Sequence, residues 1–525
     1  MSKLLTIKEA SAWASEYLKK EVTTSNISYL INYGRISKKV TEGRSQVVKE
    51  ELIKYYEKNN QTKEDRWKDK LGEDLNWTLS FSECKESETT KHVHRLHPYK
   101  GKFIPQLVEY FLDDHVDEFK TETFFNEGDT VLDPFCGSGT TLVQASELGI
   151  NAIGIDISAF NAQISNSKIG SYDLKDIQTT AESITNYLEE FISMQRNTDF
   201  EAILFQELKE FNDKHFPTPE YKYGVAQKEI DEKVYGQEKE SKFLPMYEKL
   251  VQVFDIVLTQ EQNDNFLDRW FSTVVRNEID LVFNRIEAVQ NLATKQMLRI
   301  ILSRTIRSCR ATTHSDLGTL LVPQHTTYYC KKHGKICKPI FSILSWWKRY
   351  TTDTIKRLEE FHKLRTGTTQ ICLAGDSRNI DLFTELEPEN AQFANHLRGE
   401  KIDGIFSSPP YVGLIDYHEQ HAYSYDLFGI GRKDELEIGP LYKGQGKAAK
   451  ESYTQAIAEV LNNSKKYLKE DYNVFLVAND KNGLYPKIAE LAGMKIVNQY
   501  KRPVLNRVEK DRAAYAEIIF HLKQI

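Results

Sequence analysis

The feature that most constrains this chain is a glycine-rich turn between a short apolar strand and a helix. Residues 129–142 read DTVLDPFCGSGTTL, which predicts a strand at 130–132 and a helix from Thr140 onward. The glycines at 137 and 139 let the backbone turn sharply and approach a ligand closely, and the helix N-terminus adds oriented N–H groups. A second strand within 151–158 ends at Asp156, where a carboxylate can accept hydrogen bonds from ribose hydroxyls. A tight strand-to-helix connection without a ligand is the simpler alternative.

A second constrained element closes another predicted strand, in KIDGIFSSPPY at 401–411. Pro409 and Pro410 fix the backbone and lack N–H donors, so the segment leaves the strand as a rigid extended turn. The Ser408 hydroxyl and the Pro409 carbonyl can then accept both hydrogens of an exocyclic amine, which frees the nitrogen lone pair for attack on a methyl group. Tyr411 offers a flat face on which an extruded base can stack. The alternative is a Pro-Pro strand terminator.

The two elements resemble motifs of DNA amino-methyltransferases that use S-adenosyl-L-methionine. The glycine turn is similar to their motif I, DPF-x-GSGTT, and Ser408–Tyr411 to their motif IV, (D/N/S)-P-P-(Y/F). In that family the serine form is associated mainly with cytosine N4, and the Asn and Asp forms mainly with adenine N6. The resemblance covers roughly 92–170 and 370–525.

The resemblance also implies roles for single residues. HPYKGKFIPQL (97–107) looks like the motif that closes over the methionine end of the cofactor, and Asp376 matches an acid that contacts the cofactor's adenine amine. The implied catalytic residues are Ser408, Pro409, Pro410 and Tyr411. The implied cofactor-binding residues are Lys100, Phe103, Pro105, Asp133, Pro134, Phe135, Gly137, Ser138, Gly139, Thr140, Asp156 and Asp376.

The pattern along the chain predicts a Rossmann-like α/β sheet with an insertion. Apolar strands alternate with helices before 170 and after 370, whereas the spacing of apolar residues between them is largely helical. The predicted organisation is a helix-turn-helix-like module at 1–60, a polar linker at 61–91, a cofactor-binding methyltransferase segment at 92–170, a helical and basic insertion at 171–365, and a catalytic methyltransferase segment at 366–525. The familiar family order places target recognition after the third motif, whereas this insertion precedes it.

The N-terminal 60 residues predict a small DNA-binding module. Thr6 and Glu9 form a capping-box pattern, a turn precedes a second helix at 26–32, and a strand and helix follow. The arrangement resembles excisionase- and MerR-like helix-turn-helix modules. We expect Ser25, Asn26, Ser28 and Tyr29 to face a DNA groove and Lys38 and Lys39 to contact phosphates. A helical hairpin that docks on the catalytic domain is the alternative.

The charge distribution also favours a nucleic-acid partner. The chain of 525 residues has a net charge of −6, yet residues 299–365 carry a local excess of basic side chains together with several aromatic ones. The residues expected to contact DNA there are Arg304, Arg307, Arg310, Lys331 and Lys332. A solvated helical face is the alternative.

Three residues of this basic segment have the spacing of metal ligands. Cys330, His333 and Cys337 have spacings that could hold zinc, with Cys309, His314 or His325 as a fourth ligand. No fourth ligand is evident from the spacing, so no metal site is predicted.

The sequence therefore predicts a site-specific DNA methyltransferase that acts on cytosine N4 in a restriction–modification system. Its expected partners are double-stranded DNA and a separate cognate endonuclease. An adenine-N6 enzyme is the nearest alternative, followed by an RNA methyltransferase or a DNA-binding regulator with an inactive methyltransferase domain. The few cysteines, the lack of an apolar leader and the lack of a membrane-length apolar run favour a bacterial cytoplasmic protein bound to the nucleoid.

Overall fold

The computed structural model describes residues 3–19, 21–41, 44–59, 67, 71, 75–195, 197–260, 265–316, 320–504 and 515–525. The chain forms two compact units. Unit 1 comprises Met1–Arg66, Tyr187–Asp280 and Cys309–Ile343, and unit 2 comprises Trp67–Asn186, Leu281–Ser308 and Leu344–Ile525. None of the described helices is long and apolar enough to cross a membrane.

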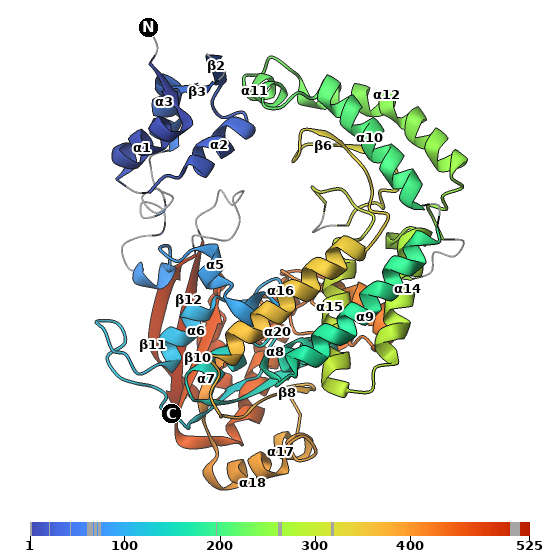
Figure 1. Cartoon of the computed structure of the whole chain (residues 1–525). Coiled ribbons are helices and arrows are strands. Elements are labelled where there is room, and N and C mark those ends of the chain that lie inside the picture. Colours follow the sequence, from blue (N-terminus) through green and yellow to red (C-terminus); the bar gives the residue numbers. More distant parts are fainter. Residues whose placement is uncertain are drawn as a thin grey trace. The chain divides into compact units, whose positions relative to one another are not determined.

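Unit 2 is built on a seven-stranded sheet (Figure 1). Its strands are β4 (Thr130–Asp133), β5 (Asn151–Asp156), β8 (Gln370–Ala374), β9 (Ile402–Ser407), β10 (Leu468–Ala478), β11 (Met494–Pro503) and β12 (Ala516–Gln524). They lie in the order β11-β12-β10-β9-β4-β5-β8, with parallel pairing from β10 to β8 and β12 antiparallel to both of its neighbours. This topology confirms the predicted Rossmann-like sheet, which here ends in an antiparallel hairpin of β11 and β12.

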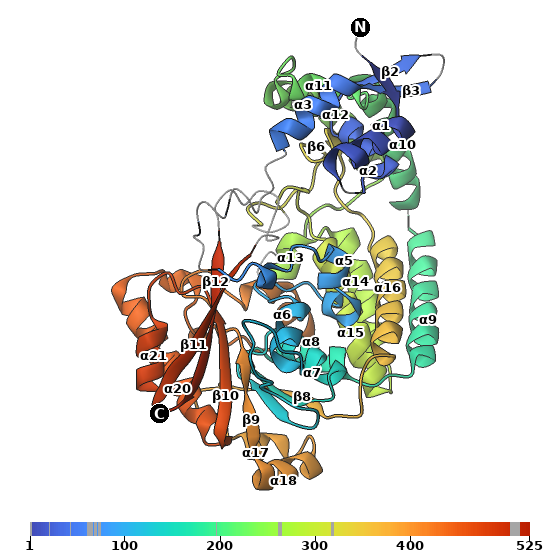
Figure 2. The same ribbon diagram turned by 90° about the vertical axis from the view of Figure 1, so that its left-hand side faces the viewer.

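Helices cover both faces of the sheet (Figure 2). On one face, α17 (Leu382–Leu386), α18 (Ala391–Glu400), α20 (Lys447–Lys465) and α21 (Tyr485–Leu491) bury an apolar core that includes Ile405 and Ile457. The other face carries α6 (Pro105–Leu112), α7 (Thr140–Glu147) and α8 (Ala159–Ile169). There Phe111 of α6 packs against Phe406 and Phe475, with ring centroids 5.7 and 4.9 Å away. Burial on both faces explains the near-continuous apolar strands of the sequence.

Two longer helices, α15 (Leu292–Ser308) and α16 (Leu344–His362), pack against each other in unit 2. Arg304 of α15 is buried, and its Nη2 lies 2.6 Å from Asp353 Oδ2 of α16. α15 also contacts α8, and α16 contacts η2 (His92–Arg95). The predicted insertion at 171–365 is therefore divided: 187–280 and 309–343 belong to unit 1, and its remainder belongs to unit 2.

The remaining elements of unit 2 are short, apart from two helices that continue into unit 1. The short ones are η1 (Thr78–Ser80), α5 (Glu86–Thr89), η3 (Glu419–His421), α19 (Ala422–Phe428), η4 (Asp434–Leu436) and η5 (Leu441–Lys443). The continuing helices are α9 (Leu174–Ser193) and α14 (Thr273–Glu287). Within the predicted linker, Asn76 N donates to Lys501 O of β11, so this portion of 61–91 packs on the sheet.

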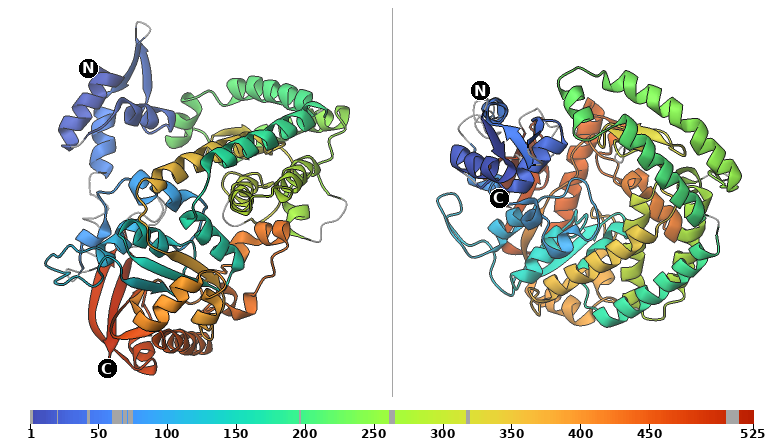
Figure 3. Two further views of the ribbon diagram at one scale, coloured as in Figure 1. Left: turned by 60° about the horizontal axis from the view of Figure 1, so that its bottom comes forward. Right: turned by 45° about the horizontal axis from the view of Figure 1, so that its top comes forward.

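The N-terminal segment of unit 1 forms a small three-stranded sheet with three helices. Its elements are β1 (Leu4–Thr6), α1 (Ile7–Leu18), α2 (Thr24–Asn32), β2 (Lys38–Thr41), β3 (Arg44–Val48) and α3 (Lys49–Asn59). Both α1 and α2 begin with a capping box, at Thr6 with Glu9 and at Thr23 with Asn26. The β2–β3 hairpin projects beyond the helices (Figure 3).

The rest of unit 1 is mainly helical. It contains α10 (Asn197–His215), α11 (Glu220–Ala226), α12 (Glu232–Val253), α13 (Phe266–Trp270) and a hairpin of β6 (Tyr328–Cys330) with β7 (Lys335–Cys337). The side-chain amide of Asn212 in α10 bonds both to the N–H and to the carbonyl of Ile336. Gly34, after α2, lies so close to α11 that an added Cβ would be 2.5 Å from the Lys222 carbonyl. The N-terminal segment therefore packs on the helical region of the same unit.

Replacement of Gly404 in β9 with alanine should destabilise unit 2. An added Cβ would lie 2.1 Å from the carbonyl oxygen of Asn473 in β10 and 3.0 Å from the Phe125 ring, so the central strands would have to separate. We expect Gly404→Ala to lower the free energy of unfolding by about 3 kcal/mol in urea denaturation. The control is Gly399→Ala in α18, where nothing lies within 4 Å of the added Cβ. Equal effects of the two substitutions would contradict this account.

Candidate active site

The glycine turn connects the end of β4 to α7 with two residues in the left-handed region. Gly137 has φ +53° and Gly139 has φ +75°, a conformation that disfavours residues with a Cβ. Glycine is also favoured sterically at both positions. A Cβ at Gly137 would lie 3.0 Å from the Tyr99 hydroxyl, and a Cβ at Gly139 would lie 2.9 Å from Ser165 Oγ. The turn thus brings bare backbone to the carboxyl edge of the sheet.

Asp156 at the end of β5 lies beside this turn. Its Oδ2 accepts from Gly137 N at 2.8 Å, and its Oδ1 accepts from Ser158 N at 2.9 Å and Asn161 Nδ2 at 3.1 Å. A carboxylate offers about four acceptor positions, so Oδ2 retains one. Burial raises the pKa of Asp156 to about 6, although these hydrogen bonds act to lower it. The side chain is therefore fixed, with one acceptor position left for a hydroxyl donor.

Asp133 at the end of β4 has a different role, because it is buried beneath the turn. Its Oδ1 accepts from Ser407 Oγ at 2.5 Å and from Phe135 N at 3.2 Å. Ser407 precedes Ser408, so this contact joins the glycine turn to the S-P-P-Y element. Burial raises the pKa of Asp133 to about 6.

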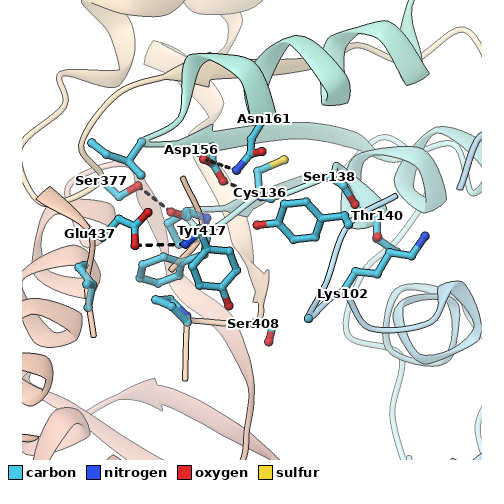
Figure 4. Close-up of a pocket in the computed structure, with 18 of the residues that line it drawn as sticks. Lys102, Cys136, Ser138, Thr140, Asp156, Asn161, Ser377, Ser408, Tyr417 and Glu437 are labelled. Carbon is cyan, nitrogen blue, oxygen red and sulfur yellow. Dashed lines mark hydrogen bonds between the residues drawn. The ribbon is translucent and has the colours of Figure 1, made fainter. Parts of the chain in front are cut away.

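One pocket of about 840 Å³, including the region open to solvent, lies across the ends of these strands (Figure 4). The predicted residues that line it are Phe103, Pro134, Phe135, Gly137, Ser138, Thr140, Asp156, Asp376, Ser408 and Pro410. Lys102, Ser138 and Thr140 lie at one end, and Ser377 and Glu437 lie at the other. It lies at the carboxyl ends of the parallel strands, where open α/β sheets bind their ligands.

The S-P-P-Y element borders the pocket through Ser408 and Pro410, whereas Pro409 is buried. Ser408 Oγ donates to Val477 O of β10 at 3.2 Å, so its lone pairs remain available to accept. Tyr411 does not line the pocket: its hydroxyl donates to Glu517 Oε1 at 2.9 Å, and its ring packs in a cluster with Trp77 and Tyr515.

Asp376 lines the pocket but is held by its neighbour Arg378. The Arg378 Nε and Nη2 atoms donate to its carboxylate at 2.6 to 3.0 Å, and Arg378 N also donates to Oδ1. Burial acts to raise the pKa of Asp376, but the bonds from Arg378 outweigh it and lower the pKa. Asp376 is therefore an ionised acid whose acceptor positions are largely used.

Several lining residues were not predicted from the sequence. Glu437 accepts hydrogen bonds from the N–H groups of Tyr417 and His418, at 3.2 and 2.7 Å, which fixes the loop after the S-P-P-Y element. Lys102 Nζ donates to His94 O at 2.5 Å, and burial lowers its pKa to about 8. No motif marks Glu437, because its segment contacts the pocket only after folding, whereas Lys102 lies within the predicted 97–107 motif, from which Lys100 was predicted instead. By contrast, Asn161 could have been predicted from the sequence, because it lies in the first turn of the helix that follows Asp156.

Four of the predicted cofactor-binding residues do not line the pocket. Lys100 is exposed and its backbone N–H donates to Gln420. Pro105 is buried at the start of α6, while Asp133 and Gly139 support the turn from below.

The predicted DNA-contacting residues differ in exposure. Ser25, Asn26, Tyr29, Lys38, Lys39, Lys331 and Lys332 are exposed, Ser28 and Arg307 are half-buried, and Arg304 and Arg310 are buried. Because Arg304 is also paired with Asp353, it is poorly placed to neutralise a phosphate. Burial likewise argues against a phosphate contact by Arg310.

Replacement of Asp133 with asparagine should change how stability depends on pH. Its folded pKa is raised, so the stability it contributes is complete below pH 4 and is lost as the pH rises through about 6. Urea unfolding from pH 4 to 7 should therefore show Asp133→Asn gaining up to about 3 kcal/mol relative to the unmodified protein. The exposed Asp471→Asn is the control. A pH-independent difference for Asp133→Asn would contradict the burial argument.

The pocket's unsatisfied polar atoms favour a ligand that carries both a nucleoside and charged groups. Ser138 Oγ and Asn161 Oδ1 are buried and have no hydrogen-bond partner among the described residues, and both residues line the pocket. Buried polar atoms of this kind are normally satisfied. Together with the free acceptor of Asp156 and the Lys102 ammonium group, they fit S-adenosylmethionine.

Comparisons with known proteins agree with this site. Residues 12–167 match the N6_N4_Mtase family model, described as DNA methylase. The type II methyltransferase M.MjaII of Methanocaldococcus jannaschii is 45% identical over 99% of this chain and 97% of its own. M.BsoBI of Geobacillus stearothermophilus is 40% identical over 14% of this chain and 13% of its own, and M.MvaI of Kocuria varians is 31% identical over 19% and 21%.

A solved structure, the rRNA methyltransferase AviRa from Streptomyces viridochromogenes, covers 84% of this chain and 94% of its own at 9% identity. Its TM-score is 0.29. The match to M.MjaII spans both units and both halves of the pocket. The chain belongs to the type II DNA methyltransferases of the N6/N4 amino-methyltransferase family, whose methyl donor is S-adenosylmethionine.

Proposed function

We propose that this protein methylates the exocyclic N4 of cytosine at a specific DNA sequence, in a base extruded from the duplex. The observation that carries the proposal is that the glycine turn after β4 and Ser408 after β9 border the same pocket. A cofactor on the turn and an amine at Ser408 would then be neighbours, as methyl transfer requires.

S-adenosylmethionine supplies an electrophilic methyl group when it is bound. Asp156 Oδ2 would accept a ribose hydroxyl, and Lys102 would pair with the carboxylate of the methionine moiety. Ser138 Oγ and Asn161 Oδ1 would gain the partners they lack. Asp376 has little acceptor capacity left after its bonds to Arg378, so we assign it a weaker contact with the adenine amine than the sequence suggested.

Ser408 and Pro409 would hold the target amine. Because the Ser408 hydroxyl hydrogen is directed to Val477 O, its lone pairs can accept one amine hydrogen, and the Pro409 carbonyl can accept the other. Neither proline has an N–H that would compete. Holding both hydrogens localises the lone pair on nitrogen and directs it toward the methyl group.

Tyr411 lies outside the pocket, and in this proposal its ring stacks on the extruded base beside that pocket. Glu517 holds its hydroxyl, and Arg502 Nε lies 3.9 Å from Glu517 Oε2. The ring is thereby fixed before the base arrives, which lowers the ordering cost of stacking.

Serine at 408 favours cytosine over adenine as the target base. The support for this choice is the family tendency of the serine form, and adenine N6 is the alternative that the same chemistry would serve. Incubation of the protein with S-adenosylmethionine and unmethylated genomic DNA, followed by nucleoside mass spectrometry, distinguishes them. We expect N4-methylcytosine; N6-methyladenine would refute the base assignment, and no methylated base would refute the activity.

DNA contacts are proposed for the N-terminal segment and the basic segment. α2 would present Ser25, Asn26, Ser28 and Tyr29 to a groove, although the Asn26 side chain also caps α2. Lys38 and Lys39 on the exposed β2 strand and Lys331 and Lys332 between β6 and β7 would contact phosphates. A cognate restriction endonuclease, encoded separately, would complete the system.

Substitutions in the pocket should separate cofactor binding from turnover. Asp156→Ala removes the ribose acceptor, so calorimetry should show S-adenosylmethionine binding weakened by about 10- to 100-fold. Tyr411→Ala should leave that affinity within about threefold and lower single-turnover methylation by about 100-fold, because stacking on a base contributes about 1–3 kcal/mol. The opposite pattern would overturn these assignments.

Charge reversal on β2 should weaken DNA binding. Lys38→Glu with Lys39→Glu should reduce the slope of log affinity against log salt by about 2, as expected for two lost phosphate contacts. Lys447→Glu with Lys495→Glu, both exposed in unit 2, makes the same change in net charge and is the control. If both double variants bind DNA alike, β2 does not contact DNA.

A further inference from the structure

A cluster of four metal-type ligands lies in unit 1, apart from the residues used above. It consists of His314, Cys330, His333 and Cys337, whose ligand atoms all lie within 4.8 Å of one another. Two of these residues end the strands β6 and β7, and His333 lies in the turn between them. The fourth, His314, comes from the chain before the hairpin. Folding thus supplies the ligand that the spacing alone did not identify.

The distances match those of a tetrahedral zinc centre. His314 Nδ1 lies 3.6 Å from Cys330 Sγ, and His333 Nδ1 lies 3.4 Å from Cys337 Sγ. Zinc–sulfur bonds of about 2.3 Å and zinc–nitrogen bonds of about 2.0 Å at tetrahedral angles place sulfur and nitrogen about 3.5 Å apart. Two thiolates with two imidazoles also form a donor set that selects zinc over hard cations.

The backbone around the cluster is shaped for such a centre. Cys330 O accepts from both His333 N at 3.1 Å and Gly334 N at 2.7 Å, and Gly334 has φ +64°. This tight turn brings His333 back toward the two cysteines. In the β6–β7 register Cys330 pairs with Lys335 and Tyr328 with Cys337, so both thiols occupy one face of the hairpin.

The hairpin is short, and its two faces pack against different surroundings. Each strand has three residues, which is shorter than an isolated hairpin can sustain. Tyr329 and Ile336 pack on the larger apolar core of unit 1, whereas Tyr328, Cys330 and Cys337 on the other face form a small cluster of their own among the described residues. A metal crosslink would tie the hairpin to the segment that carries His314.

We propose that unit 1 binds one structural zinc ion through His314 Nδ1, Cys330 Sγ, His333 Nδ1 and Cys337 Sγ. All four coordination positions are filled by protein, which leaves none for water or substrate. The Tyr328 hydroxyl, 2.7 Å from His314 Nδ1, would turn from the imidazole to a thiolate when the ion binds. The ion orders the segment that carries Lys331 and Lys332.

Elemental analysis tests this directly. The full chain, purified without a histidine tag, should contain about one zinc ion per chain after gel filtration. Cys330→Ser with Cys337→Ser should lose it and still bind S-adenosylmethionine through unit 2. The control His325→Gln removes another histidine of unit 1 that lies outside the cluster, and it should retain the metal. Zinc-free protein, or zinc retained at the same content in the double variant, would overturn the proposal.

A second measurement remains informative if the double variant does not fold. Metal-free protein prepared with a chelator and titrated with Co²⁺ should develop the visible ligand-field bands of tetrahedral cobalt and a thiolate charge-transfer band. Saturation should come at about one equivalent. Absence of both bands, or a Cys330–Cys337 disulfide found by mass spectrometry under non-reducing conditions, would refute the site.

Discussion

The parallel pairing of β4 with β9 is the constraint on which the rest of the catalytic unit depends. It registers Val131 with Gly404 and Leu132 with Ile405, and so places the carboxyl ends of both strands at one edge. Each strand then continues into a segment with unusual backbone, the glycine turn in one case and the two prolines in the other. The Asp133–Ser407 hydrogen bond joins these segments beneath the pocket. The segments that follow Asp133 and Ser407, residues 274 positions apart along the chain, thereby border one pocket.

The same arrangement explains why buried carboxylates surround the pocket. Asp133 and Asp156 are both buried, and burial raises both pKa values to about 6. The free-energy cost of burying these carboxylates is offset by hydrogen bonds from Gly137 of the turn, Asn161 of α8 and Ser407. Polar contacts of this kind are not needed in an apolar core. Here they fix the acceptor atoms of the site before a ligand binds.

The sequence predicted the sheet and the two ends of the site because both depend on local chemistry. Glycines with positive φ and consecutive prolines restrict the backbone at their own positions, and strand periodicity is local as well. The contributions of Tyr417 and Glu437 required tertiary structure, since no local pattern brings their loop to the pocket, whereas Lys102 lies within the predicted 97–107 motif. Arg304 illustrates the same limit: its charge suggested a phosphate contact, but packing of α15 on α16 pairs it with Asp353. His314 was one of several candidate fourth ligands until folding placed it beside Cys330.

The most direct test of the central claim is a crystal structure of the protein with a non-reactive cofactor analogue and a duplex containing its recognition site. The account predicts an extruded cytosine whose amino nitrogen lies about 3 Å from Ser408 Oγ, facing the analogue on the glycine turn. A target base that remains stacked in the duplex, or an analogue bound away from Asp156 and Gly137, would contradict it.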